Sequence, residues 1–129
     1  MRKTLFSALV LCSALFGATS AFAGSKQSYP VGISVGWAWG SLGSTRNSAD
    51  INSFISCTTY AWPNYAPSMS CSAYTGSAYA SCSSSDPSLI AAAQSISANS
   101  YVAFYWDPGS AKCTLLQINN GSLYEPGLK

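Results

Sequence analysis

The sequence predicts an α+β fold: a small disulfide-stapled antiparallel β-sheet domain with one helix packed across the sheet. Three observations lead to this prediction. Apolar and small polar residues, mostly serine, alternate with a period of two along much of the chain after residue 30. Only residues 86–99 carry a helical pattern. Four cysteines lie in residues 24–129, which is typical of small exported domains.

The first 23 residues have the pattern of a secretory signal peptide. Arg2 and Lys3 form a positive n-region, residues 5–16 form a short apolar run, and residues 21–23 (Ala-Phe-Ala) form a small-x-small cleavage site. We therefore expect a secreted or periplasmic protein whose single mature domain comprises residues 24–129.

Without the signal peptide the formal charge is zero, because residues 24–129 contain four basic and four acidic residues. Nucleic-acid binding requires a basic patch, which four scattered cations cannot form. No apolar stretch after residue 23 approaches the ~20 residues of a membrane span. We therefore expect neither a nucleic-acid partner nor a membrane span. The charged residues are Lys26, Arg46, Lys112 and Lys129 against Asp50, Asp86, Asp107 and Glu125.

The cysteines predict a disulfide framework and no metal site. Cys12 lies inside the apolar run of the leader and is removed with it, which leaves an even number with three possible connectivities. The chain has no histidine, and no two of these cysteines have the C-x₂₋₄-C spacing of a zinc site, so we expect no metal and no cofactor. Side-chain parity along the strands favours the pairings Cys57–Cys71 and Cys82–Cys113.

The predicted elements before the helix are all strands. Residues 24–30 lead into one strand over residues 31–40, whose large residues share one face and whose small residues, Gly36 among them, share the other. Such a bare face allows another part of the protein or a ligand to approach the backbone closely. A loop over residues 41–50 precedes strands at residues 51–62, 68–74 and 77–82, with turns at residues 63–67 and at Thr75-Gly76.

The helix and the last strands complete the prediction. Asp86 is the expected N-cap, Pro87 suits the first helical position, and Asn99 is the expected terminator. Strands follow at residues 101–106, 111–119 and 122–125, joined by turns at residues 107–109 and at Asn120-Gly121, with antiparallel neighbours throughout. The apolar stripe of the helix consists of Leu89, Ala92, Ala93 and Ile96.

The sequence contains few residues that could act in catalysis. The absence of histidine excludes Ser-His and Cys-His nucleophiles. Asp86 and Asp107 are explained by a helix cap and a turn, which leaves Asp50 and Glu125 as the pair that a carboxylate hydrolase would need. We predict a protein without enzymatic activity.

Four residues are candidates for ligand binding: Trp37, Trp39, Arg46 and Asp50. The two tryptophans share one side of a strand, so they either continue the core or present paired rings to a glycan or a partner. Arg46 and Asp50 either form an exposed ion pair that steadies their loop, or Arg46 binds an anionic group of a partner.

The run from Trp39 through residues 46–50 (Arg-Asn-Ser-Ala-Asp) to Cys57 resembles small exported bacterial proteins, and this resemblance implies no functional residue. We predict a small exported protein that acts by binding an unknown protein or glycan. The alternatives are a glycan-binding module that uses exposed aromatic residues, and a secreted inhibitor or toxin.

Overall fold

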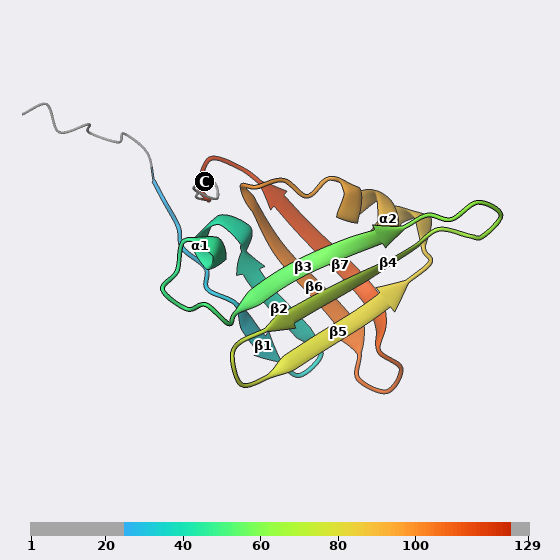
Figure 1. The fold of residues 1–129 in the computed structure, drawn as a ribbon, viewed down its shortest axis with the longest axis horizontal. Coiled ribbons are helices and arrows are strands. Elements are labelled where there is room, and N and C mark those ends of the chain that lie inside the picture. The colour runs from blue at the N-terminus through green and yellow to red at the C-terminus, as the bar shows by residue number, and fades with distance from the viewer. Residues whose placement is uncertain (1–24, 125–129) are drawn as a thin grey trace, which may run out of the picture.

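The computed structural model describes residues 25–124, so the predicted signal peptide and Glu125 lie outside the described residues. Within them, seven strands form one sheet of order β1-β2-β6-β7-β5-β4-β3, accompanied by two short helices (Figure 1). In chain order, the elements are β1 (Gly32–Ser34), β2 (Trp37–Ser41), α1 (Leu42–Arg46), β3 (Phe54–Tyr60), β4 (Ser68–Tyr74), β5 (Tyr79–Ser84), α2 (Pro87–Gln94), β6 (Ser100–Asp107) and β7 (Lys112–Asn120).

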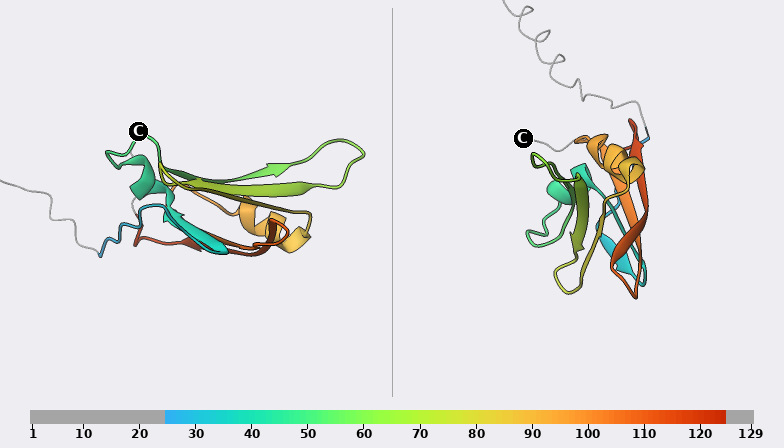
Figure 2. Two further views of the ribbon diagram at one scale, coloured as in Figure 1. Left: turned by 90° about the horizontal axis from the view of Figure 1, so that it is seen from below. Right: turned by 90° about the vertical axis from the view of Figure 1, so that its right-hand side faces the viewer.

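The sheet folds over into two layers that face each other. Strands β3, β4 and β5 form one layer, and β1, β2, β6 and β7 form the other (Figure 2). The layers join at β5 and β7, which pair in parallel at Ser83 and Lys112 only. The expectation of antiparallel neighbours throughout is therefore wrong at this join.

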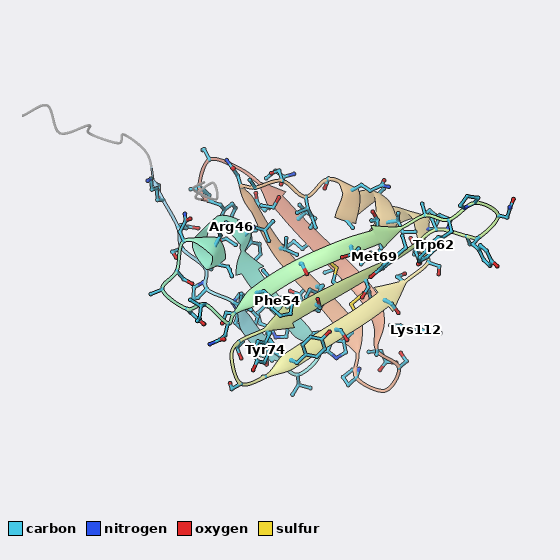
Figure 3. All side chains as sticks on the ribbon, in the orientation of Figure 1. Arg46, Phe54, Trp62, Met69, Tyr74 and Lys112 are labelled. Carbon is cyan, nitrogen blue, oxygen red and sulfur yellow. A yellow bond between two sulfur atoms is a disulfide. The ribbon has the colours of Figure 1, made fainter. Side chains whose placement is uncertain are left out.

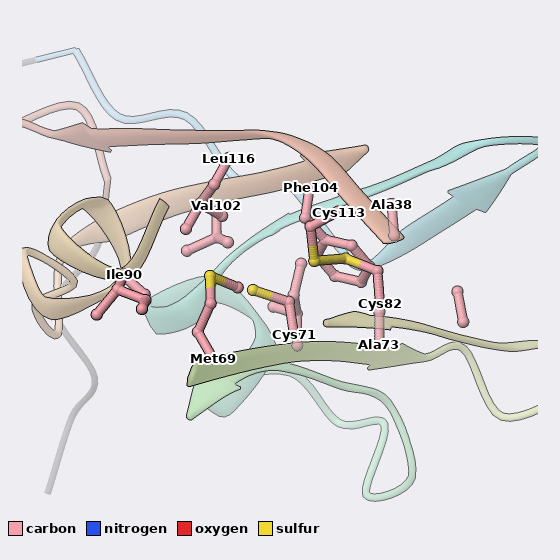
Figure 4. Packing of buried hydrophobic residues seen from close by; sticks show 13 residues of the cluster. Ala38, Met69, Cys71, Ala73, Cys82, Ile90, Val102, Phe104, Cys113 and Leu116 are labelled. Carbon is pink, nitrogen blue, oxygen red and sulfur yellow. A yellow bond between two sulfur atoms is a disulfide. The ribbon is translucent and has the colours of Figure 1, made fainter. Parts of the chain in front are cut away.

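The core lies between the two layers, where their inward side chains meet (Figure 4). Helix α2 packs against β3, β4 and β7 and closes one end of the space between the layers, whereas we expected one helix packed across the sheet (Figure 2). The buried cluster consists of Ala38, Ile55, Met69, Cys71, Ala73, Ala80, Cys82, Ile90, Ala93, Val102, Phe104, Cys113 and Leu116.

Residues 31–40 form a hairpin and not the single strand that we predicted. Strands β1 and β2 pair antiparallel, and Val35 and Gly36 form the two-residue turn between them. Gly36 has φ +81°, a conformation that glycine adopts without strain, and Val35 is 88% exposed. The reversal breaks the predicted face of large residues, because Ile33 now lies opposite Ala38 and Gly32 opposite Trp39.

Helix α2 follows from local sequence, whereas α1 was not predicted. The predicted loop over residues 41–50 contains α1. The carboxylate of Asp86 accepts hydrogen bonds from the backbone N–H groups of Ser88 (2.8 Å) and Leu89 (3.4 Å), as expected of an N-cap. Helix α2 ends at Gln94, ahead of the predicted terminator Asn99.

The two disulfides are Cys57–Cys71 and Cys82–Cys113, with Cα atoms 4.0 and 5.0 Å apart. These are the pairings that strand parity favours. Cys71 lies directly opposite both Cys57 and Cys82, whereas the predicted turn at Thr75-Gly76 would place Cys82 two positions out of register. The turn is centred one residue later, on Gly76 and Ser77, as the hydrogen bond from Thr75 N–H to the carbonyl of Ala78 shows.

The predicted last strand over residues 122–125 is wrong within the described residues. Tyr124 forms a single parallel bridge with Gln27, and Tyr124 N–H donates to the carbonyl of Gly121. The segment therefore turns after β7 and binds the residues that lead into the fold.

Candidate functional site

The fold has two outward faces, and the strand register shows which side chains each face carries. Residues directly opposite each other on paired strands point to the same side. Ala38 and Phe104 point into the core, so Trp37, Trp39 and Tyr105 point outward from the first layer. Met69, Cys71 and Ala73 are buried, so the alternate residues of β4 point outward from the second layer.

The outer side of the first layer carries a stack of three aromatic rings, Trp37, Trp39 and Tyr105. The rings of Trp37 and Trp39 stack with centroids 4.0 Å apart, and Trp37 also stacks with Tyr105 at 5.6 Å. Trp39 lies against Gly32, where an added Cβ atom would come within 2.2 Å of an indole carbon. Ala103, opposite Trp39 in register, is fully buried although it points away from the core. We call Trp37, Trp39 and Tyr105 the tryptophan stack.

A tyrosine cluster continues this outer side at the other end of β6. Tyr101 packs edge-on against Tyr29 (5.3 Å) and stacks with Tyr124 (5.7 Å). Burial raises the pKa of the Tyr101 phenol, and the nearby phenols of Tyr105, Tyr124 and Tyr29 add smaller effects in the same direction. These rings also pack mainly against one another.

The outer side of β3, β4 and β5 carries rows of hydroxyl groups. Ser56 lies opposite Ser72, and their Oγ atoms are 3.4 Å apart. Rows of this kind run across all three strands, with neighbouring strands about 4.8 Å apart. We call this side the hydroxyl face. Its two central rows are Ser56, Ser72 and Ser81, and Thr58, Ser70 and Ser83.

Aromatic residues stand at both ends of the hydroxyl face. Phe54, Tyr74 and Tyr79 form a row across the three strands at one end. At the other end, Tyr60 stacks with Trp62 of the β3–β4 loop at 5.4 Å and an interplanar angle of 8°. Figure 3 shows Phe54 and Tyr74 at one end of the face and Trp62 at the opposite end.

Two of these end residues, Tyr79 and Trp62, are more open to solvent than the rings of the tryptophan stack. Tyr79 is 63% exposed and Trp62 is 57% exposed, whereas Trp37 and Trp39 are only partly exposed. The strands and loops between Asp50 and Asp86 contain no charged residue. Lys112 on β7 borders the face beside Ser83. The result is a broad uncharged surface with free aromatic rings at its ends.

The structure separates the four predicted ligand residues. Trp37 and Trp39 lie outside the buried core cluster, so the interpretation as core residues is wrong. Their rings also face each other and do not lie side by side, coplanar and open to a ligand. The predicted strand with one bare face does not form, and the hairpin instead places the Trp39 ring over Gly32.

Arg46 and Asp50 do not form the expected ion pair. The Asp50 carboxylate instead accepts hydrogen bonds from the backbone N–H of Asn52 (2.8 Å) and from the N–H and hydroxyl of Ser53. The bond from the Ser53 hydroxyl, followed by those from the two backbone N–H groups, lowers the pKa of Asp50. Asp50 therefore shapes the turn before β3, while the Arg46 guanidinium has no carboxylate or hydrogen-bond partner in residues 25–124.

The remaining carboxylates also serve local structure. Asp86 caps α2, and Asp107 accepts bonds from Gly109 N–H and the Ser110 hydroxyl, each at 3.0 Å. Glu125 lies outside the described residues. No group of three or more potential metal ligands occurs within the described part of the chain.

Sequence reasoning missed the two ends of the hydroxyl face. A usable signal was present, because the Cys57–Cys71 pairing already sets Phe54 opposite Tyr74. The remaining step, Tyr74 opposite Tyr79, depends on the turn position that we predicted one residue too early.

Neither helix among residues 25–124 is long and apolar enough to cross a membrane. No protein-family model matches this chain, and neither the curated proteins nor the solved structures give a match. The functional argument therefore rests on the site itself.

Proposed function

We propose that this protein is an exported binding protein without enzymatic activity, and that its ligand is an uncharged polysaccharide bound on the hydroxyl face. The observation that carries the proposal is the combination of free aromatic rings with rows of hydroxyl groups on one uncharged surface. Exposed aromatic side chains that present an apolar ring beside polar groups are typical of binding surfaces.

The chemistry of the two surfaces is complementary. A sugar ring presents C–H groups on its faces and hydroxyl groups on its rim. Aromatic rings such as Tyr79 and Trp62 can cover the C–H faces, and serine and threonine hydroxyls both donate and accept hydrogen bonds with the rim. The strands that form this surface carry no charge themselves, so they offer an anionic ligand no ion pair.

The dimensions suit a chain of several sugar rings. Phe54 and Tyr60 are six residues apart on β3, which corresponds to about 20 Å along an extended strand. The three strands span about 10 Å in the other direction. A polymer can therefore contact aromatic residues at both ends and hydroxyl groups between them.

The test is binding of the oxidised, exported protein to insoluble cellulose and chitin, measured by depletion from solution. We expect saturable binding to at least one of these neutral polymers and no binding to anionic alginate. Tyr79→Ala and Trp62→Ala should each weaken binding roughly two- to tenfold, because each removes one stacking contact.

Val35→Ala is the matched control, since Val35 is an exposed apolar residue in the β1–β2 turn, away from the hydroxyl face. It should bind like the wild type. The proposal is wrong if neither polymer is bound, or if both aromatic variants bind as well as the control.

One observation favours a second function, that of a secreted inhibitor. The β3–β4 loop extends beyond the body of the protein (Figure 2) and carries Tyr65, which is 77% exposed, next to Trp62. Tyrosine and tryptophan dominate protein–protein interfaces. This function predicts that Tyr65→Ala abolishes inhibition in a panel of extracellular glycosidases and proteases and leaves polysaccharide binding unchanged.

A further inference from the structure

A second possible binding site lies at the free edge of β3, where a cavity of about 590 Å³ opens between the two layers. Its apolar lining comes from four separate parts of the chain, Leu42 of α1, Ile55 of β3, Ile96 after α2, and Val102 of β6. The volume lies within the range of about 300–1,000 Å³ that is usual for small-molecule sites.

The edge of β3 adds backbone polar groups to this lining. In the β4–β5 hairpin, Thr75 N–H donates to the carbonyl of Ala78. Because hydrogen-bonded positions recur at every second residue of an antiparallel strand, the N–H and C=O groups of Cys71 also bond to β5. The opposite residue Cys57, with its Cα atom 4.0 Å from that of Cys71, is therefore a non-hydrogen-bonded partner. The N–H and C=O groups of Ile55 and Cys57 consequently point away from β4, toward the cavity that both residues line.

Arg46 supplies the charge at the cavity opening. It belongs to the lining and is exposed, so it lies at the rim. Its expected partner Asp50 is bound to Asn52 and Ser53 instead. It is the only arginine after residue 23, and no acidic residue lines the cavity.

We propose that this cavity binds a small amphipathic carboxylate, such as a medium-chain fatty acid. The apolar chain lies between the layers against Leu42, Ile55 and Val102, and the carboxylate binds the Arg46 guanidinium at the rim. A guanidinium offers two parallel N–H donors to a carboxylate, which is the strongest arrangement available to this pair. This site adjoins the hydroxyl face, with which it shares Phe54 and Ser56 of β3, but the proposal does not depend on polysaccharide binding.

The size of the ligand follows from what bounds the cavity. Helices α1 and α2 both pack against β3, so the free edge between them is short. A long peptide strand or a polymer cannot extend along it, whereas a single alkyl chain can enter. Because backbone polar groups also face the opening, a ligand with a polar head fits better than a pure hydrocarbon.

The test is titration of the oxidised, isotope-labelled exported protein with decanoate below its micelle concentration, followed by NMR. We expect saturable one-to-one binding, with shifts centred on Leu42, Ile55, Ile96 and Val102. Decanol, which has the same chain without the charge, should bind roughly tenfold or more weakly.

Two variants test the two halves of the site. Arg46→Gln should weaken decanoate roughly tenfold or more and leave decanol unchanged, whereas Lys112→Gln, which removes an exposed cation elsewhere, should change neither. Ala98→Trp at the rim should weaken both ligands by narrowing the opening, since Ala98 is exposed and lines the cavity. Because Arg46 and Ala98 are exposed, neither change should prevent folding.

The proposal is overturned if decanoate does not bind at millimolar concentration, if its shifts map to another surface, or if Arg46→Gln binds it like the wild type. If Trp62→Ala weakens polysaccharide binding and leaves decanoate binding intact, the two ligands bind independently, and the failure of one proposal would not decide the other.

Discussion

The two outward faces of this sheet use aromatic side chains in opposite ways. In the tryptophan stack, the rings lie against one another and against Gly32, and they bury Ala103 beneath them. At the ends of the hydroxyl face, Tyr79 lies opposite Tyr74 and Trp62 stacks on Tyr60, but both residues remain more than half exposed. The comparison shows that a ring packed on several sides by other rings and by backbone stabilises the fold, whereas a ring with one such neighbour keeps a face free for a ligand.

Reduction of the disulfides should have the largest effect, and it should fall on the layer that bears the hydroxyl face. Both disulfides involve β3, β4 or β5, and Cys82–Cys113 spans the join at which only Ser83 and Lys112 pair. From sequence separations of 14 and 31, each contributes roughly 3–4 kcal/mol in the chain-entropy model. Melting with and without reductant measures the total.

Paired serine variants separate the two disulfides. Removing Cys82–Cys113 should expose the amides of β5 to hydrogen exchange, while those of β2 and β6 stay protected. Equal melting temperatures in the oxidised and reduced protein would mean that the disulfides do not stabilise the fold.

The sharpest test of the comparison replaces one tryptophan on each face with alanine. Trp37→Ala removes the shared member of two stacked pairs and should reduce the free energy of unfolding by roughly 2–3 kcal/mol. Trp62→Ala removes one exposed stacked pair, that with Tyr60, and should change it by about 1 kcal/mol or less. Chemical denaturation of both variants measures the difference, and similar values would mean that the two faces do not differ in this way.

Gly32→Ala tests the contact beneath the tryptophan stack. The added Cβ atom would overlap the Trp39 ring, so the ring must move, at a cost of about 1–3 kcal/mol. Near-ultraviolet circular dichroism should record the change in tryptophan packing. Ser34→Ala, two residues along the same strand, is exposed and should behave like the wild type. An unchanged spectrum for Gly32→Ala would place Trp39 elsewhere.

Gly36→Val should destabilise by about 1–2 kcal/mol because of backbone strain, and not because of overpacking on a strand face. Gly36 has φ +81°, and the nearest atom to an added Cβ is the Trp106 carbonyl oxygen at an ordinary 3.5 Å. Gly36→Asn should restore much of the stability, since asparagine tolerates this conformation better. If valine and asparagine are equally harmful in thermal melts, the cause is steric.

The smallest effect concerns Asp86, which caps the helix that closes the space between the two layers. The hydrogen bonds from the Ser88 hydroxyl and N–H and from Leu89 N–H lower its pKa below the usual 3.8. Its contribution is therefore present above that pH and is lost as the pH falls through the lowered pKa. Asp86→Ala should lower the melting temperature by a few degrees at pH 7 and leave it unchanged at the most acidic pH. A constant difference at all pH values would mean that the carboxylate charge has no part in the cap.

Local signals in the sequence predicted a good part of the fold. The N-cap, the proline at the start of α2, the β-rich class and the strands around Cys71 and Phe104 follow from residues close together in the chain. The hairpin at Gly36 was missed because Val31 to Trp39 alternate without interruption, so a period of two fits both one long strand and two short ones. Helix α1 was missed because its sequence, Leu-Gly-Ser-Thr-Arg, has turn composition and forms only against β2, β3 and β6.

What the sequence by itself determined is local: the cap of α2, the disulfide parity, the lack of charge between Asp50 and Asp86, and the absence of histidine chemistry. The tertiary structure alone decided which rings are free. The β5–β7 join folds the sheet into two layers. The absence of a side chain at Gly32 leaves room for the Trp39 ring, and the turn at Gly76 and Ser77 places Tyr74 opposite Tyr79. The join pairs residues far apart in the chain. The other two depend on the register of a hairpin, which a period of two leaves open, because a one-residue change in a turn moves the whole pairing.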